Sequence, residues 1–168
     1  MHDPARSTPW TSVHREVDKA AHYDDLTREL DALLSGETDP VANAANAAAA
    51  IYHALPGLNW AGFYFLRQNE LVLGPFQGLP ACVRIPLGKG VCGTAAAERR
   101  SVLVPDVEAF PGHIACDTAS RSELVVPLLK GEALLGVLDL DSPMLGRFDD
   151  ADRLGCEMLA RVIAGHVV

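Results

Sequence analysis

Two apolar runs of strand length constrain the fold of this chain more than any other feature. Residues 123–129 and 133–140 flank Lys130-Gly131-Glu132, a spacing that predicts a β-hairpin. With a three-residue turn, Glu123 is expected opposite Asp139, with Asp141 two residues further along the same face. The reverse face is expected to carry the apolar side chains of Leu124, Val126, Leu128, Leu134, Leu138 and Leu140.

The remaining segments surround this hairpin with further strands and with helices. Asp39-Pro40 is typical of a helix start, and Asp149 is expected to cap the last helix. Leu26, Leu30, Leu33 and Leu34 keep helical spacing in the first helix. Helices are predicted at 16–34, 40–55, just after Gly88, and 149–166; strands at 58–66, 70–76, 81–85 and 101–104; and a long loop at 105–122. This order indicates an α+β fold, a central antiparallel sheet with helices packed mainly on one face.

Length and charge limit the class of protein. The 168 residues suffice for one compact domain, expected at 13–168 after a flexible segment 1–12, and no attached output domain is expected. The net charge of −8 argues against nucleic acid or an anionic membrane as partner. The N-terminus lacks a secretory signal, so a cytoplasmic location is expected, where the four cysteines would be thiols.

Glu123, Asp139 and Asp141 are predicted to converge at one end of otherwise apolar strands. Like charges that are close together and half-buried repel, so at least one carboxyl pKa should rise. The first interpretation is a site that binds a cation or holds a proton. The alternative is a set of carboxylates solvated at the rim of the sheet.

Cys82, Cys92 and Cys116 lie in loops or at the starts of elements. Cys92 falls at a predicted helix N-terminus, where the helix dipole would favour the thiolate. Cys116 has His113 and Arg121 nearby in sequence, which would lower its pKa if they face it. Buried, unreactive cysteines are the alternative. The spacing does not match paired zinc ligands, so metal binding is a weak interpretation.

Three further side chains can be interpreted as core residues. Trp60 and Tyr64 share one face of a predicted strand with Gly62, which suits either a core or an aromatic wall for a small ligand. Cys156 lies within the last predicted helix and is interpreted as structural.

Several motifs together resemble the free methionine-(R)-sulfoxide reductases, enzymes on a GAF-type fold. The similarity runs from about Asp24 to the C-terminal helix. Three cysteines combined with Asp-x-Asp are specific within GAF domains. The resemblance is carried by Asn59-Trp60-Ala61-Gly62-Phe63-Tyr64, Gly88-Lys89-Gly90-Val91-Cys92-Gly93-Thr94, Phe110-Pro111-Gly112-His113-Ile114-Ala115-Cys116-Asp117, Ser120-Arg121-Ser122-Glu123 and Gly136-Val137-Leu138-Asp139-Leu140-Asp141-Ser142.

The resemblance implies a role for each group at the site. Cys116 would be the nucleophile that attacks the sulfoxide sulfur, and Cys82 and Cys92 would resolve the resulting sulfenic acid as a disulfide. The three carboxylates would hold the substrate ammonium, and Trp60 and Tyr64 would form the aromatic side of the pocket. A carboxylic acid of raised pKa would donate the proton to the sulfoxide oxygen.

The implied activity is that of an oxidoreductase, an L-methionine (R)-S-oxide reductase active in oxidative stress. The implied electron donor is thioredoxin, and no metal or other cofactor is expected. A homodimer through the long N-terminal helices is compatible with the sequence. Two alternatives remain open: a non-catalytic GAF sensor of a small metabolite or of redox state, because fold alone does not define function, and a zinc-binding interaction module.

Overall fold

The computed structural model describes residues 18–114 and 118–167. Within these residues, six antiparallel strands form one sheet in the order β3-β2-β1-β6-β5-β4. The strands are β1 (Trp60–Arg67), β2 (Glu70–Gly78), β3 (Arg84–Pro86), β4 (Val102–Val104), β5 (Ser122–Lys130) and β6 (Ala133–Ser142). The helices are α2 (Lys19–Leu34), α3 (Pro40–Ala54), α4 (Gly90–Glu98), the 3-10 turn η2 (Val107–Ala109) and α5 (Asp150–Ala164).

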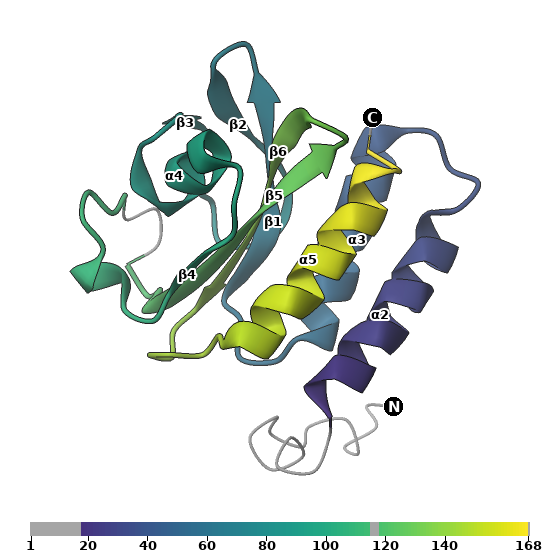
Figure 1. Ribbon diagram of the computed structural model, residues 1–168, viewed down its shortest axis with the longest axis horizontal. Helices are drawn as coiled ribbons and strands as arrows, with labels where there is room; N and C mark the ends of the chain where they lie inside the picture. The colour runs from purple at the N-terminus through teal and green to yellow at the C-terminus, as the bar shows by residue number, and fades with distance from the viewer. Residues whose placement is uncertain (1–17, 115–117, 168) are drawn as a thin grey trace.

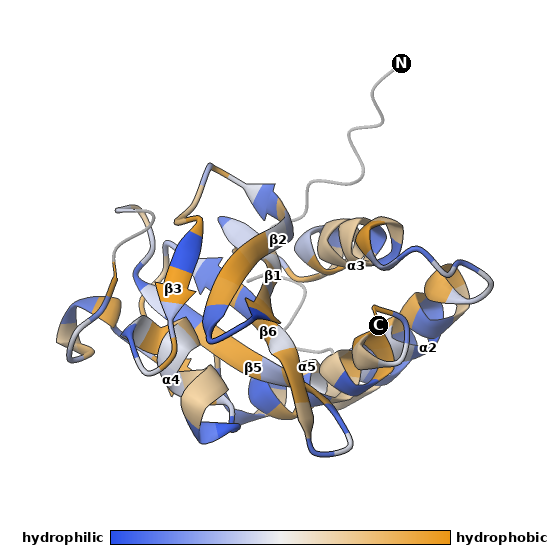
Figure 2. Ribbon diagram, turned by 90° about the horizontal axis from the view of Figure 1, so that it is seen from above, coloured by the Kyte–Doolittle hydropathy of each residue, from blue (hydrophilic) through white to orange (hydrophobic). Residues whose placement is uncertain are grey.

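The sheet separates two unequal layers. Helices α2, α3 and α5 cover one face, and α4 lies with β3 on the opposite side (Figure 1). The view from above shows the same division, with α2, α3 and α5 gathered away from α4 (Figure 2). The predicted α+β fold, with helices mainly on one face, is confirmed. Within the described residues, no helix is both long and apolar enough to span a lipid bilayer.

Side-chain caps fix where two of the helices begin. Asp39 accepts a hydrogen bond from the Ala42 amide at 2.8 Å, and Pro40 opens α3. Asp149 and Asp152 form a reciprocal capping box at the start of α5. Both predicted starts are therefore confirmed. Of the leucines at helical spacing in α2, Leu33 is 49% exposed, and Tyr23 is buried on the face that carries Leu26, Leu30 and Leu34.

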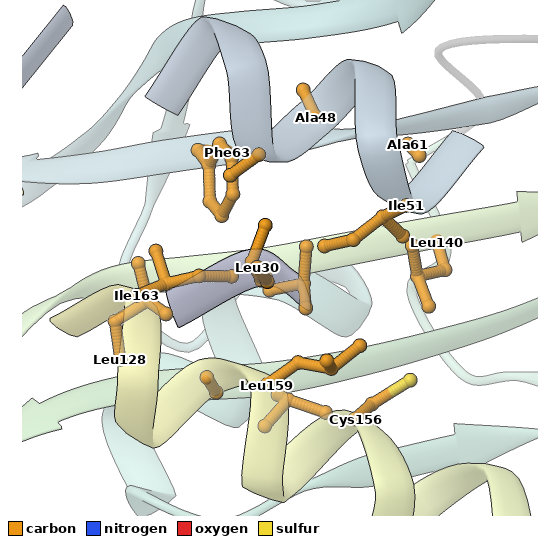
Figure 3. Close-up of a cluster of buried hydrophobic side chains, with 14 of the residues drawn as sticks. Leu30, Ala48, Ile51, Ala61, Phe63, Leu128, Leu140, Cys156, Leu159 and Ile163 are labelled. Carbon is orange, nitrogen blue, oxygen red and sulfur yellow. The ribbon is translucent and has the colours of Figure 1, made fainter. Parts of the chain in front are cut away.

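The larger core lies between the sheet and the three helices. Leucines and alanines of α2 and α3 meet the face of β1 that carries Ala61 and Phe63 (Figure 3). Helix α5 packs on the same face of the sheet and contributes Leu159 and Ile163 to this core. The small residues of α3 let that helix approach β1 and β2 closely.

The predicted register of the β5–β6 hairpin is wrong by two residues. Glu123 pairs with Asp141, and Val125 pairs with Asp139. The turn is shorter than expected because Lys130 already pairs with Ala133, and an irregularity follows between Leu128 and Leu129. A shift of two residues leaves every side chain on its predicted face. Beyond the irregularity the faces exchange, so Leu134 packs against the smaller core and Leu135 against the larger one.

Two segments are shorter or more ordered than expected. The strand predicted at 81–85 is confined to β3, and β2 extends to Gly78. The predicted 105–122 loop contains η2 within its described residues. The predicted flexible segment 1–12, and the domain boundary after it, lie outside the described residues.

Candidate functional site

A pocket lies between the first turn of α4 and the end of the sheet where β5 begins and β6 ends. Because β5 and β6 are antiparallel, the first residues of β5 lie beside the last residues of β6. This pairing brings together Glu123, Asp139 and Asp141, as the sequence predicted. Among the described residues, the pocket is lined by Ile85, Lys89, Gly90, Val91, Cys92, His113, Ile114, Ser120, Glu123, Asp139 and Asp141.

Two of the three carboxylates are buried. Glu123 is 5% exposed and Asp139 is 6% exposed. Burial raises the pKa of Asp139 to about 7. Burial, followed by the charges of Asp139 and Asp141, raises the pKa of Glu123 well above its usual range. The expected rise of a carboxyl pKa is therefore confirmed, and the pocket can hold a proton close to neutral pH.

Cys92 points at these carboxylates from the third residue of α4. Its thiol Sγ donates to Glu123 Oε1 at 3.9 Å. Burial, and then the charges of Asp139 and Glu123, raise the pKa of the Cys92 thiol well above its usual value. The expected thiolate at a helix N-terminus is therefore wrong, because desolvation and the neighbouring carboxylates outweigh the helix dipole.

The other cysteines differ in state and place. Cys82 takes part in a disulfide, whereas Cys92 and Cys156 are free thiols. Cys116, the expected nucleophile, lies outside the described residues. Cys156 is buried in the larger core, where its Sγ donates to the Tyr23 hydroxyl at 3.8 Å. Its expected structural role agrees with this position.

Trp60 and Tyr64 lie on the same side of the sheet as the pocket. They are buried in the smaller core, with ring centroids 5.9 Å apart. The Tyr64 hydroxyl donates to the Cys82 carbonyl at 3.0 Å, and the Trp60 indole N–H donates to the Leu79 carbonyl at 3.1 Å. Within the described part of the chain neither ring lines the pocket, so their contact with a ligand stays a prediction.

Sequence reasoning gave no pocket role to several lining residues. His113 Nε2 lies 3.7 Å from Glu123 Oε2, and burial lowers the pKa of His113. Ser120 accepts a hydrogen bond from Asn59 Nδ2 at 3.1 Å and lines the same pocket. The sequence signal was that both residues lie in the long loop before β5 and within the motifs that carry the resemblance.

The fold and the pocket indicate the general class of protein to which the chain belongs. The GAF domain family matches residues 29–167, most of the chain. This match and the six-stranded sheet with its helices identify the chain as a GAF domain.

Individual relatives narrow the class. The free methionine-R-sulfoxide reductase of Escherichia coli is 52% identical over 143 residues, 85% of this chain and 87% of that protein. Protein YtsP of Bacillus subtilis is 57% identical over 137 residues, 80% of this chain and 84% of that protein. The X-ray structure of free methionine-R-sulfoxide reductase from Neisseria meningitidis in complex with its substrate superposes with a TM-score of 0.85 at 47% identity, covering 90% of this chain and 91% of that one. The chain belongs to the free methionine-(R)-sulfoxide reductase family, which is a family of enzymes.

Proposed function

We propose that this protein reduces free L-methionine-(R)-sulfoxide to L-methionine. The observation that carries the proposal is the carboxylate cluster of Glu123, Asp139 and Asp141 inside a pocket that Cys92 also lines. A free amino acid has an ammonium group, which neutralises buried carboxylates and donates three hydrogen bonds to them. A methionine inside a polypeptide lacks that charge, so the pocket favours the free amino acid.

The proposed chemistry begins at Cys116. Its thiolate attacks the sulfoxide sulfur while a buried carboxylic acid protonates the sulfoxide oxygen. The bond between the two sulfur atoms then breaks as the hydroxyl oxygen passes from the methionine sulfur to the Cys116 sulfur, which leaves methionine and a sulfenic acid on Cys116. Glu123 and Asp139 suit the proton donor, because the raised pKa of each keeps a proton available near neutral pH.

The proposed second half of the reaction is disulfide formation and recycling. A second thiol attacks the sulfenic sulfur, releases water and forms a disulfide, which a dithiol protein of the thioredoxin type then reduces to two thiols. We propose that Cys82, and not Cys92, is the first thiol to attack the sulfenic acid. This assignment is supported by the disulfide state of Cys82 and by the free, protonated thiol of Cys92 beside Glu123.

Replacing the proposed nucleophile tests this function. We expect Cys116→Ser to lose at least about 100-fold in turnover, because a hydroxyl cannot replace a thiolate as attacking group. The measurement is NADPH oxidation coupled through thioredoxin and thioredoxin reductase, with free methionine-(R)-sulfoxide as substrate. Cys156→Ser, which changes a thiol of the larger core, is the matched control and should retain turnover.

The same assay separates recognition of the ammonium from the chemistry. N-acetyl-methionine-(R)-sulfoxide keeps the sulfoxide but lacks the positive charge, so its kcat/KM should fall about 100-fold or more.

Full activity of Cys116→Ser would refute the assignment of Cys116 as the nucleophile. A ligand-induced thermal shift without any consumption of sulfoxide would favour the sensor alternative.

A further inference from the structure

One thiol and two carboxylates meet in the pocket. The Cys92 Sγ and one carboxylate oxygen each from Glu123 and Asp139 all lie within 4.8 Å of one another. All three side chains are buried. They come from α4, β5 and β6, so the three elements hold the donors in place from different directions.

One carboxylate oxygen of Asp139 lacks a hydrogen-bond partner within the described residues. Asp139 Oδ1 is buried and makes no hydrogen bond within the described residues, although Asp139 lines the pocket. A buried carboxylate oxygen without a donor is unfavourable. The oxygen therefore favours a positively charged ligand beside it.

The spacing of the donors suits a small metal ion. Around a tetrahedral Zn²⁺, Zn–S and Zn–O bonds place a sulfur and an oxygen ligand roughly 3.6 Å apart. The Cys92 Sγ and Glu123 Oε1 are 3.9 Å apart. Only a small side-chain adjustment is needed to bring both atoms to bonding distance. A water molecule can complete the fourth position of a tetrahedral site.

We infer that the pocket binds a borderline-soft divalent cation, Zn²⁺ or Cd²⁺, through Cys92, Glu123 and Asp139. A thiolate with two carboxylates selects such ions over Mg²⁺ and Ca²⁺, which prefer oxygen ligands alone. On binding, the cation displaces the thiol proton of Cys92, and the thiolate becomes a ligand. This inference concerns metal binding by the resting protein and does not depend on the proposed reaction.

The same site has a consequence for any ammonium ligand. Glu123 and Asp139 cannot hold a cation and an ammonium group at once, so the two ligands exclude each other. Metal bound here therefore acts as a competitive inhibitor at the pocket and not as a cofactor.

Direct metal binding tests the inference. The full-length protein is reduced, freed of reductant and titrated with Cd²⁺, and the ultraviolet charge-transfer absorbance of thiolate–Cd²⁺ is followed. Zn²⁺ is titrated in parallel by calorimetry. We expect one equivalent of each ion to bind. Cys92→Ser should abolish the absorbance at one equivalent and weaken Zn²⁺ binding by more than about tenfold. Loss of a residue that only supports a ligand already weakens metal affinity by about tenfold or more, and loss of the ligand itself should weaken it further.

Two further variants distinguish this site from thiols elsewhere. Asp139→Asn keeps all four cysteines and should still weaken Zn²⁺ binding by more than about tenfold. Cys82→Ser should bind both ions like the wild type. Far-UV circular dichroism establishes that each variant is folded, and Cys92→Ala replaces Cys92→Ser if the latter is not. Unchanged binding in the Cys92 variant, loss of binding in Cys82→Ser, or no binding by the wild type would each overturn the inference.

Discussion

At the scale of single residues, burial decides the chemistry of the pocket. A helix N-terminus favours an anion by about 0.3–1 kcal/mol. Complete burial shifts a pKa by several units, and each unit corresponds to about 1.4 kcal/mol. Cys92 and Asp139 are both buried, and neither has a lysine or arginine as an ion-pair partner among the described contacts. Both groups therefore hold their protons to higher pH than exposed groups do.

The raised pKa of Asp139 predicts a pH-dependent stability. The ordinary pKa of 3.8 rises to about 7 in the folded protein. Between these values the folded state holds a proton that the unfolded state has released, so its stability falls as pH rises from about 4 to about 7 and stays low above. Asp139→Asn removes this titration. We expect the variant to be about 1–4 kcal/mol more stable than wild type at pH 8, and less than about 1 kcal/mol more stable at pH 4.

Urea unfolding of the reduced proteins at both pH values measures this effect. Asp24→Asn makes the same change on the exposed face of α2 and should alter stability by less than about 0.5 kcal/mol. If Asp139→Asn were less stable than wild type at pH 8, Asp139 would instead stabilise the fold as a carboxylate.

At the scale of elements, sequence periodicity predicted faces better than register. The period of two along a strand assigned Leu124 and Leu138 to the larger core, because a register error of two residues leaves the faces unchanged. The irregularity lies beside the pair Leu128–Gly136, and a glycine inside a strand is typical of a bulge. The prediction did not use this signal, so the predicted position of Leu134 was wrong.

The candidate site could likewise be predicted from the sequence only in part. The convergence of Glu123, Asp139 and Asp141 could be predicted because all three lie on the same two strands. The protonation of Cys92 could not, because it depends on burial by segments far away in the sequence.

Gly62 is needed for the packing of two strands, because β1 and β2 approach each other closely there. A Cβ at Gly62 would lie 2.3 Å from the Cβ of Phe76, its cross-strand partner, and 2.8 Å from the ring of Trp60. Gly62→Ala should therefore destabilise the fold by about 1–3 kcal/mol or more through overpacking. Thermal and urea unfolding measure the change.

Gly165→Ala is the matched control for this prediction. Gly165 has a φ of −74° at the end of α5, and a Cβ there would come no closer than 3.3 Å to the Val162 carbonyl oxygen. Its effect should be less than about 1 kcal/mol. Equal losses in both variants would mean that contact with Phe76 is not the cause.

At the scale of the whole molecule, one buried carboxylate ties the helical layer together. Asp152 of α5 accepts hydrogen bonds from the Tyr23 hydroxyl at 2.8 Å and from Lys19 Nζ at 2.8 Å, both on α2. It also pairs with Arg147 at 3.2 Å, and the Arg147 Nε donates to the Pro56 carbonyl after α3. The network therefore joins α2, the end of α3 and α5.

Removing this carboxylate should weaken the whole fold. Asp152→Ala leaves the buried Arg147 without its ion pair and the Tyr23 hydroxyl without its acceptor, which predicts a loss of about 3–5 kcal/mol. Urea unfolding measures the loss. Asp150→Ala, in the same turn of α5 but with its side chain 86% exposed, should cost less than about 1 kcal/mol. Similar losses in the two variants would contradict the role of the network.

The division of the molecule by its sheet has a practical consequence. The pocket opens on the α4 side, whereas the outward face of α2 lies on the opposite side, beyond the larger core. A dye, an affinity handle or a solid support attached to the exposed Glu29 of α2 would therefore stay well clear of the pocket. Attachment at this position would therefore leave the pocket open to ligands.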